Sequence, residues 1–151
     1  MNVIYTCYWG GYLAAVAASL HLGIIKGKEE IVWHKILMLP GFGEESREKL
    51  GNLRLIGYDE KGRRVFIMAS KKASPIIKRA LCGVADIFGL GKGSIKYIDL
   101  NIVGNFFTSV GVFLMRKTRF IRLGAWIFCF GILNNYEKLE AVIQNNRDEN
   151  L

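Results

Sequence analysis

Apolar and polar positions at the amino terminus predict a strand followed by a helix. Residues 3–8 are β-branched and aromatic, which favours a strand, and Gly10-Gly11 follows them as a break. Residues 12–22 are rich in Ala and Leu, which favours a helix, and Gly23 stands where a C-terminal cap is expected. The pattern therefore predicts a strand, a tight turn and a helix.

The middle of the chain predicts two short helices, a β-hairpin, a longer helix and a strand, over residues 31–39, 44–50, 53–68, 74–88 and 95–100. In the hairpin, a loop with Gly62 near its end joins two apolar segments. The longer helix begins at Ser74-Pro75. One of its faces carries Ile77, Leu81, Val84 and Phe88.

The last third of the chain predicts a helix, a strand and a helix. Residues 102–115 form an apolar helix that Asn101 can cap, and the cations that follow suit its negative end. Residues 125–130 are a continuous apolar run, typical of a strand buried on both faces of a parallel sheet, and Gly131 ends it. Asn134 has the position of an N-cap for the last helix.

This order of elements predicts the α/β class. The expected architecture is a layered α/β/α domain with a mixed, mostly parallel sheet, Rossmann-like or P-loop-like, and an inserted β-hairpin. The chain has 151 residues, 51% of them apolar, which suffices for one packed core. We therefore expect a single α/β domain over residues 1–144 and a polar tail over residues 145–151.

Residues 3–25 contain no Asp, Glu, Lys or Arg and are as long as the ~20 residues of a membrane span. Polar residues and glycines dilute this segment, so we interpret it as a strand and a helix. Met1-Asn2 offers no positive charge for a secretory signal. Three cysteines, an odd number, argue against a disulfide scaffold. The sequence thus predicts a cytoplasmic protein without a transmembrane segment.

The formal net charge of +8 is unevenly distributed. Residues 61–122 carry 13 cationic side chains against Asp86 and Asp99, a net charge of +11, which leaves −3 for the rest of the chain. This span predicts an anionic partner, and the alternative is a solvated basic face. The adjacent acids Glu44-Glu45 and Asp59-Glu60 are expected to be solvated.

Ligands of α/β sheets bind at the carboxyl ends of parallel strands, where residues 7–11, 99–101 and 131–134 are expected to meet. At Gly10-Gly11, backbone N–H groups and the helix dipole would attract an anion. The alternative is a tight turn that allows close packing, because the sequence has neither a dinucleotide nor a P-loop fingerprint. The predicted binding residues are Tyr8, Trp9, Gly10, Gly11, Tyr12, Asn101, Gly131 and Asn134.

Cys7 and Asp99 are the candidate catalytic residues. A thiol beside a helix N-terminus is activated there, whereas core packing is the alternative role of Cys7. Asp99 stands at a predicted strand end, where it would otherwise act as a cap or as a partner of Lys96. His21 and His34 lack the spacing of a metal site, so no metal is expected, and we interpret His21 as a structural donor. The residues identify no cofactor.

Four short motifs follow one another along the chain: Cys7-Tyr8-x-Gly10-Gly11 before a helix, His21-Leu22-Gly23, Leu37-x-Leu39-Pro40-x-Phe42, and Gly57-x-Asp59-Glu60-x-Gly62-x-x-Val65. In this order they resemble an uncharacterised bacterial domain-of-unknown-function family. The resemblance covers most of the chain and implies a small cytoplasmic α/β protein with no assigned reaction. Typical members place a His-Ser-Ser-like set directly after the glycines, where this chain has Tyr12-Leu13-Ala14. No catalytic role is therefore carried over.

These observations leave three functions open. The first is a binding or regulatory domain that recognises a phosphorylated small molecule or nucleotide at the Gly10-Gly11 turn. The alternative is an enzyme, a transferase or hydrolase, that uses Cys7 or Asp99 in the same cleft. The third is nonspecific nucleic-acid binding through residues 61–122. Four further aromatic residues are expected to pack in the core: Trp9, Phe106, Phe107 and Phe113. If they are exposed instead, they would mark a homodimer or membrane-surface contact.

Overall fold

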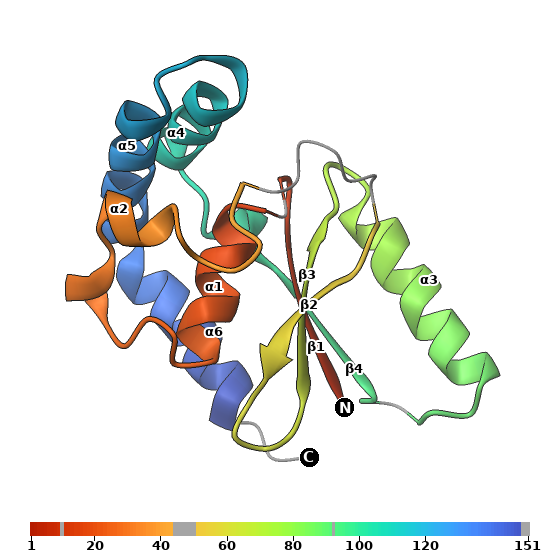
Figure 1. The fold of residues 1–151 in the computed structure, drawn as a ribbon. Coiled ribbons are helices and arrows are strands. Elements are labelled where there is room, and N and C mark those ends of the chain that lie inside the picture. The colour runs from red at the N-terminus through yellow and green to blue at the C-terminus, as the bar shows by residue number, and fades with distance from the viewer. Residues whose placement is uncertain (10, 44–50, 92, 149–151) are drawn as a thin grey trace.

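The computed structural model describes residues 1–9, 11–43, 51–91 and 93–148. Within them, one open sheet has the strand order β2-β3-β1-β4 (Figure 1). The strands are β1 (Asn2–Cys7), β2 (Arg54–Tyr58), β3 (Arg64–Ala69) and β4 (Ile95–Asp99). β1 pairs in parallel with β3 and β4, whereas β2 pairs antiparallel with β3. The predicted α/β class, mostly parallel sheet and β-hairpin are confirmed.

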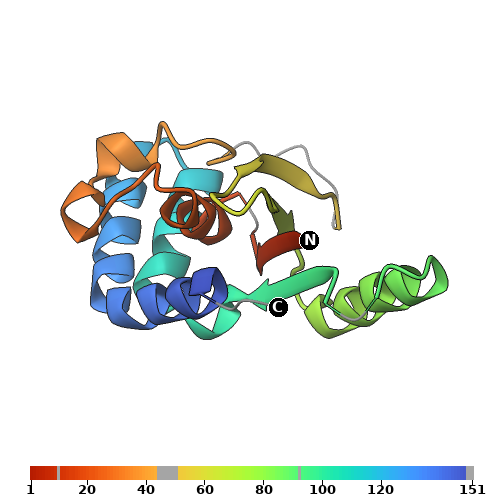
Figure 2. The same ribbon diagram turned by 90° about the horizontal axis from the view of Figure 1, so that it is seen from below.

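The helices are α1 (Leu13–His21), α2 (Trp33–Ile36), α3 (Ser74–Ile87), α4 (Phe106–Lys117), α5 (Ile121–Asn134) and α6 (Tyr136–Asp148), with short 3-10 turns η1 (Lys28–Glu30) and η3 (Leu100–Ile102). α1 and α6 lie on one face of the sheet and α3 on the other (Figure 1). α4 and α5 run side by side next to α2, away from α3 (Figures 1 and 2). Helices thus cover both faces of the sheet.

The main core lies between the sheet and α1. Along β1, Val3, Tyr5 and Cys7 belong to this core, because alternate residues of a strand point to the same face. All nine residues of α1 are buried, so the absence of charge from residues 3–25 reflects a buried strand and helix. Among the described residues, no helix combines the length and apolar character needed to cross a membrane.

The prediction of a strand over residues 125–130 is wrong, because these residues lie within the helix α5. A short apolar run fits a buried strand and a buried helix equally well. The burial follows the helical period, with core positions at Ala125, Phe128, Cys129 and Ile132. Gly124 lies against α4, where an added Cβ would be 2.8 Å from Gly111 O. The glycines of α5 therefore serve close packing between helices.

Other features of the helices also differ from the prediction. α4 is capped by Asn105, whose side chain accepts the Thr108 N–H, and not by Asn101. On α3, Val84 and Phe88 of the predicted apolar face are exposed, because α3 packs mainly on the edge strand β4. α6 continues to Asp148, through part of the segment 145–151 that we expected as a polar tail. The turn predicted at residues 44–50, with Glu44-Glu45, lies outside the described residues.

Candidate functional site

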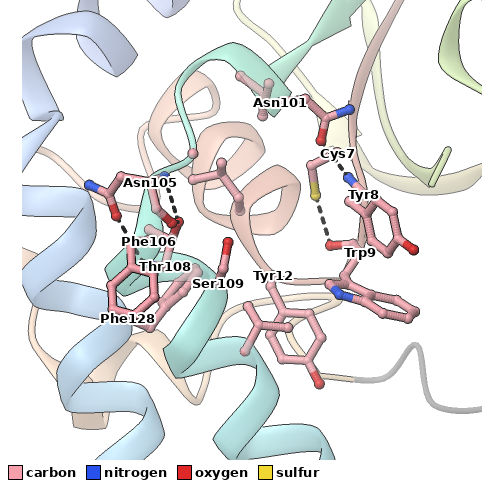
Figure 3. A pocket seen from close by; sticks show the side chains of 14 residues that line it. Cys7, Tyr8, Trp9, Tyr12, Asn101, Asn105, Phe106, Thr108, Ser109 and Phe128 are labelled. Atoms are coloured by element: carbon pink, nitrogen blue, oxygen red, sulfur yellow. Dashed lines mark hydrogen bonds between the residues drawn. The ribbon is translucent and has the colours of Figure 1, made fainter. Parts of the chain in front are cut away.

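A cavity of about 540 Å³ opens at the carboxyl ends of β1 and β4. Its volume is within the range of small-molecule sites, ~300–1,000 Å³. In Figure 3, Cys7, Tyr8 and Trp9 lie on one side and Thr108, Ser109 and Phe128 on the other. The full lining is Cys7, Tyr8, Trp9, Tyr12, Leu13, Leu100, Asn101, Gly104, Asn105, Phe106, Thr108, Ser109, Val112 and Phe128.

The loops after β1 and β4 are joined by a hydrogen bond across the cavity wall. The Tyr8 N–H donates to Asn101 Oδ1 at 2.9 Å, although the two residues are 93 positions apart (Figure 3). The predicted convergence of these two segments is therefore present. Gly10 lies outside the described residues, so its predicted contact with an anion cannot be placed in the fold.

The segment from Pro40 to Gly43 supports the turn that leads into α1. The Gly43 N–H donates to Gly11 O at 2.7 Å. The Phe42 ring packs edge-on against Tyr12 and Phe128, with centroid distances of 5.3 and 5.6 Å. Two side chains of the cavity wall are thus held by one aromatic residue of a loop.

Trp9 is flanked by two cations that sequence reasoning did not assign to the site. Arg116 Cζ lies 3.6 Å from the Trp9 ring centroid, and Lys71 Nζ lies 5.6 Å from it. Among the described residues, the buried Nε of Arg116 has no hydrogen-bond partner. Lys71 has a left-handed φ of 44°, which non-glycine residues rarely adopt. Arg116 belongs to α4 and Lys71 follows β3, so both are distant from Trp9 in sequence. No local sequence pattern therefore predicts that they contact Trp9.

The amino terminus of α1 also faces this region, since Tyr12 and Leu13 line the cavity. Tyr12 is the N-cap residue of this helix, and its own side chain makes no capping hydrogen bond. The first turn carries no acidic residue. Backbone N–H groups at such an end bear a partial positive charge, which favours a bound anion.

Of the candidate catalytic residues, Cys7 lines the cavity and Asp99 does not. Cys7 Sγ donates a hydrogen bond to Trp9 O at 2.7 Å (Figure 3). Asp99 accepts hydrogen bonds from the Ser74 hydroxyl at 2.7 Å and from the Asn101 N–H at 3.0 Å. It caps η3, which is the structural alternative considered for it.

Gly131 and Asn134 do not line the cavity, because residues 125–130 form a helix and not a fifth strand. Gly131 is buried against α4, and its carbonyl accepts the Asn105 Nδ2–H at 2.8 Å. Asn134 is exposed at the last turn of α5. Gly131 contributes to the cavity indirectly, because it holds the lining residue Asn105. Instead, α4 and α5 supply Phe106, Thr108, Ser109, Val112 and Phe128.

A second polar cluster lies at the opposite end of α1. Asp59 is almost fully buried, so the expectation that it is solvated is wrong. Its Oδ2 accepts hydrogen bonds from Arg63 Nε at 2.6 Å and from His21 Nε2 at 3.1 Å. Burial raises the pKa of the Asp59 carboxyl, but the hydrogen bonds from His21 and Arg63 outweigh it and lower the pKa to about 2.

His21 lies between Asp59 and Tyr5 in this cluster. Because the ionised Asp59 can only accept, His21 Nε2 carries the proton, and Nδ1 accepts the Tyr5 hydroxyl at 2.7 Å. Burial lowers the pKa of the His21 imidazole despite the hydrogen bond to Asp59. Arg63 further donates to the carbonyls of Asn146 and Arg147 on α6. Buried and mutually satisfied, these groups join α1, the hairpin and α6.

Comparison with known proteins identifies one family. The family described as "Protein of unknown function (DUF3189)" matches residues 2–148, nearly the whole chain. No curated protein and no solved structure matches the sequence. In the part of the chain that the structure describes, no three His, Cys, Asp or Glu side chains are grouped as metal ligands would be. On the strength of the match over residues 2–148, this chain belongs to the DUF3189 family.

Proposed function

We propose that the cavity binds a phosphorylated small molecule or a nucleotide. The observation that carries this proposal is that Arg116 and Lys71 lie over the ring of Trp9. Trp9 in turn lines a cavity at the carboxyl ends of parallel strands. Arg116 and Lys71 are not themselves lining residues, but both lie over the ring of Trp9, which does line the cavity, so their charge favours an anionic group bound beside Trp9. The amino terminus of α1, where Tyr12 and Leu13 line the cavity, adds the partial positive charge of the helix dipole.

The aromatic lining suits the rest of such a ligand. Tyr8, Trp9, Tyr12 and Phe106 offer ring faces or edges to a planar base or an apolar group. Asn101, Thr108 and Ser109 supply hydrogen-bonding groups. Apolar walls with a few polar groups are typical of ligand pockets, and the two cations on Trp9 favour a negatively charged ligand. Nucleotides and phosphorylated metabolites are cytoplasmic ligands, which accords with the predicted cytoplasmic location.

Binding is favoured over catalysis by Cys7. The Cys7 thiol donates to the Trp9 carbonyl at 2.7 Å, and an acceptor oxygen this close favours the thiol over the thiolate, which is the nucleophilic form. Asp99 has both carboxylate oxygens engaged by Ser74 and Asn101. Catalysis by Cys7 remains the second candidate, because its sulfur lies in the cavity wall.

Calorimetric titration with inorganic phosphate, AMP, ATP and ribose 5-phosphate tests the proposal. We expect saturable binding of at least one phosphorylated compound and weaker binding at higher salt. Arg116→Gln should weaken it about tenfold or more, since it removes a partly buried cation worth roughly 1–2 kcal/mol. Arg119→Gln removes an equal charge from an exposed residue and leaves the stacking of Arg116 on Trp9 in place, so it should leave the affinity unchanged.

Two outcomes would contradict the proposal: no saturable heat with any compound in the panel, or equal losses from Arg116→Gln and Arg119→Gln. Cys7→Ser separates binding from catalysis. If the cavity only binds, Cys7→Ser retains affinity and the ligand is recovered unchanged from the wild-type protein. Turnover that Cys7→Ser abolishes would assign the site to the enzymatic alternative.

A further inference from the structure

α4 and α5 form a hairpin whose helices are in direct backbone contact. A Cβ added at Gly111 would lie 2.7 Å from Gly124 O, and one at Gly131 would lie 2.7 Å from Thr108 N. Because the small residues occupy the contact, the large side chains of both helices cannot pack between them. Many of these side chains therefore lie on the outer surface of the hairpin.

Four of the exposed aromatic side chains form a continuous row across both helices. Ring contacts lead from Phe106 to Phe107 at 6.0 Å, from Phe107 to Phe130 at 5.1 Å, and from Phe130 to the stacked Trp126 at 6.4 Å. Phe106 is 76% exposed and Trp126 59% exposed. Phe113 lies two turns along α4 from Phe106 and is 58% exposed. We call this surface the aromatic face: Phe106, Phe107, Phe113, Leu123, Trp126 and Phe130.

The charge of the hairpin has one sign. Residues 102–134 contain Arg116, Lys117, Arg119 and Arg122 and no Asp or Glu. Arg116 stacks on Trp9 and is half-buried, whereas Lys117, Arg119 and Arg122 are exposed where α4 turns into α5. Arg122 Cζ also lies 5.9 Å from the ring centroid of Trp33. Lys117 follows Phe113 by four residues on α4, so the two share one side of the helix. The aromatic face therefore ends in a cluster of cations.

We propose that the aromatic face and its three exposed cations dock on a membrane surface that contains anionic phospholipid. Exposed Phe and Trp side chains enter the headgroup region of a bilayer, and Lys and Arg attract anionic headgroups. The same face of a second copy would offer the cations no carboxylate, because residues 102–134 contain no Asp or Glu. A nucleic acid would meet the cations but would leave the aliphatic and aromatic surface without a matching partner. The lipid surface complements both features.

The test is sedimentation of the full chain with vesicles, either of pure phosphatidylcholine or of two parts phosphatidylcholine to one part phosphatidylglycerol. We expect binding to the anionic vesicles that weakens with salt, and little binding to neutral vesicles. Lys117→Gln/Arg119→Gln/Arg122→Gln should weaken partitioning about a hundredfold, from roughly fivefold per basic residue near an anionic surface. Phe113→Ser/Trp126→Ser, made in the otherwise unchanged chain, should abolish partitioning into the anionic vesicles.

Matched controls come from α3, which lies on the other face of the sheet (Figure 2). Lys78→Gln/Arg79→Gln and Ile76→Ser/Ile87→Ser change exposed residues of the same kinds and should bind as the wild type does. The proposal is overturned by failure to sediment with anionic vesicles, by equal binding to neutral vesicles, or by unchanged binding of Phe113→Ser/Trp126→Ser. A dimer that this last variant dissociates, without vesicle binding, would assign the face to a second copy.

Discussion

His21 and Asp59 are joined by a hydrogen bond of 3.1 Å between imidazole Nε2 and carboxylate Oδ2, although they are 38 residues apart in sequence. Their side chains are 0% and 5% exposed. The bond joins the end of α1 to the turn of the β2–β3 hairpin, and Arg63 extends the connection to α6. Three separate segments therefore depend on one buried carboxylate.

Asp59→Asn should destabilise the protein at pH 7. The pKa of Asp59 is lowered from 3.8 to about 2, and this difference corresponds to about 2 kcal/mol of folding free energy. A depressed carboxyl pKa stabilises the fold above pH 3.8, and that stabilisation is lost as the pH falls towards 2. Urea unfolding between pH 7 and pH 2.5 should show the loss in the wild type and a smaller slope below pH 4 in Asp59→Asn.

Glu60→Gln is the matched control for this measurement. Glu60 is adjacent, its side chain is 91% exposed, and it pairs with Arg147 at 3.7 Å. Exposed ion pairs contribute little, so we expect a change below about 1 kcal/mol. Equal destabilisation by the two substitutions would show that burial of Asp59 does not determine its effect.

His21→Gln tests a different pH range. Because burial lowers the pKa of His21 below its ordinary value of 6.5, the unfolded chain takes up a proton before the folded protein does. The contribution of His21 is therefore present above pH 6.5 and is lost as the pH falls from there. The wild-type free energy of unfolding should decline between pH 7 and pH 5, and His21→Gln should remove this slope. The exposed His34 supplies the control, since His34→Gln should retain it.

Gly111→Ala should separate α4 from α5. The added Cβ would lie 2.7 Å from Gly124 O and from Phe128 N, and neither helix backbone can yield easily. Overpacking of this kind costs ~1–3 kcal/mol. Gly83→Ala in α3 is the opposite case, because no atom lies within 4 Å of its added Cβ. It should stabilise the protein by about 0.5–1 kcal/mol, since Ala favours helix over Gly. Thermal unfolding of the two variants measures both effects.

The three cysteines should differ in reactivity towards Ellman's reagent at pH 8. Cys82 is exposed, whereas burial raises the pKa of the Cys129 thiol to about 12. We expect about one thiol per native chain to react at once, because reaction requires accessible thiolate. Cys82→Ser should remove this fast phase and Cys129→Ser should leave it unchanged. A fast phase that persists in Cys82→Ser would place the reactive thiol at Cys7 and favour the catalytic alternative.

Sequence patterns sufficed where local chemistry determines structure. The β-branched run in residues 3–8 and the loop ending at Gly62 each specify their element through neighbouring residues. The approach of Cys7–Tyr8 to Asn101 followed from one topological rule, that parallel strands share an edge at their carboxyl ends. These inferences needed no knowledge of which helices pack together.

Tertiary structure alone decided the rest. Residues 125–130 are apolar enough for a buried strand, and only their packing against α4 through Gly111 and Gly124 makes a helix of them. Arg116 meets Trp9 across 107 positions of sequence, and Asp59 is buried only because His21 and Arg63 reach it. The sequence by itself determined the class of fold and one edge of the cavity, because these depend on residues near in sequence. The cavity wall formed by α4 and α5, the cations on Trp9 and the cluster around Asp59 depend on contacts between segments that are distant in sequence. Such contacts form only when the chain folds, so local sequence patterns do not reveal them.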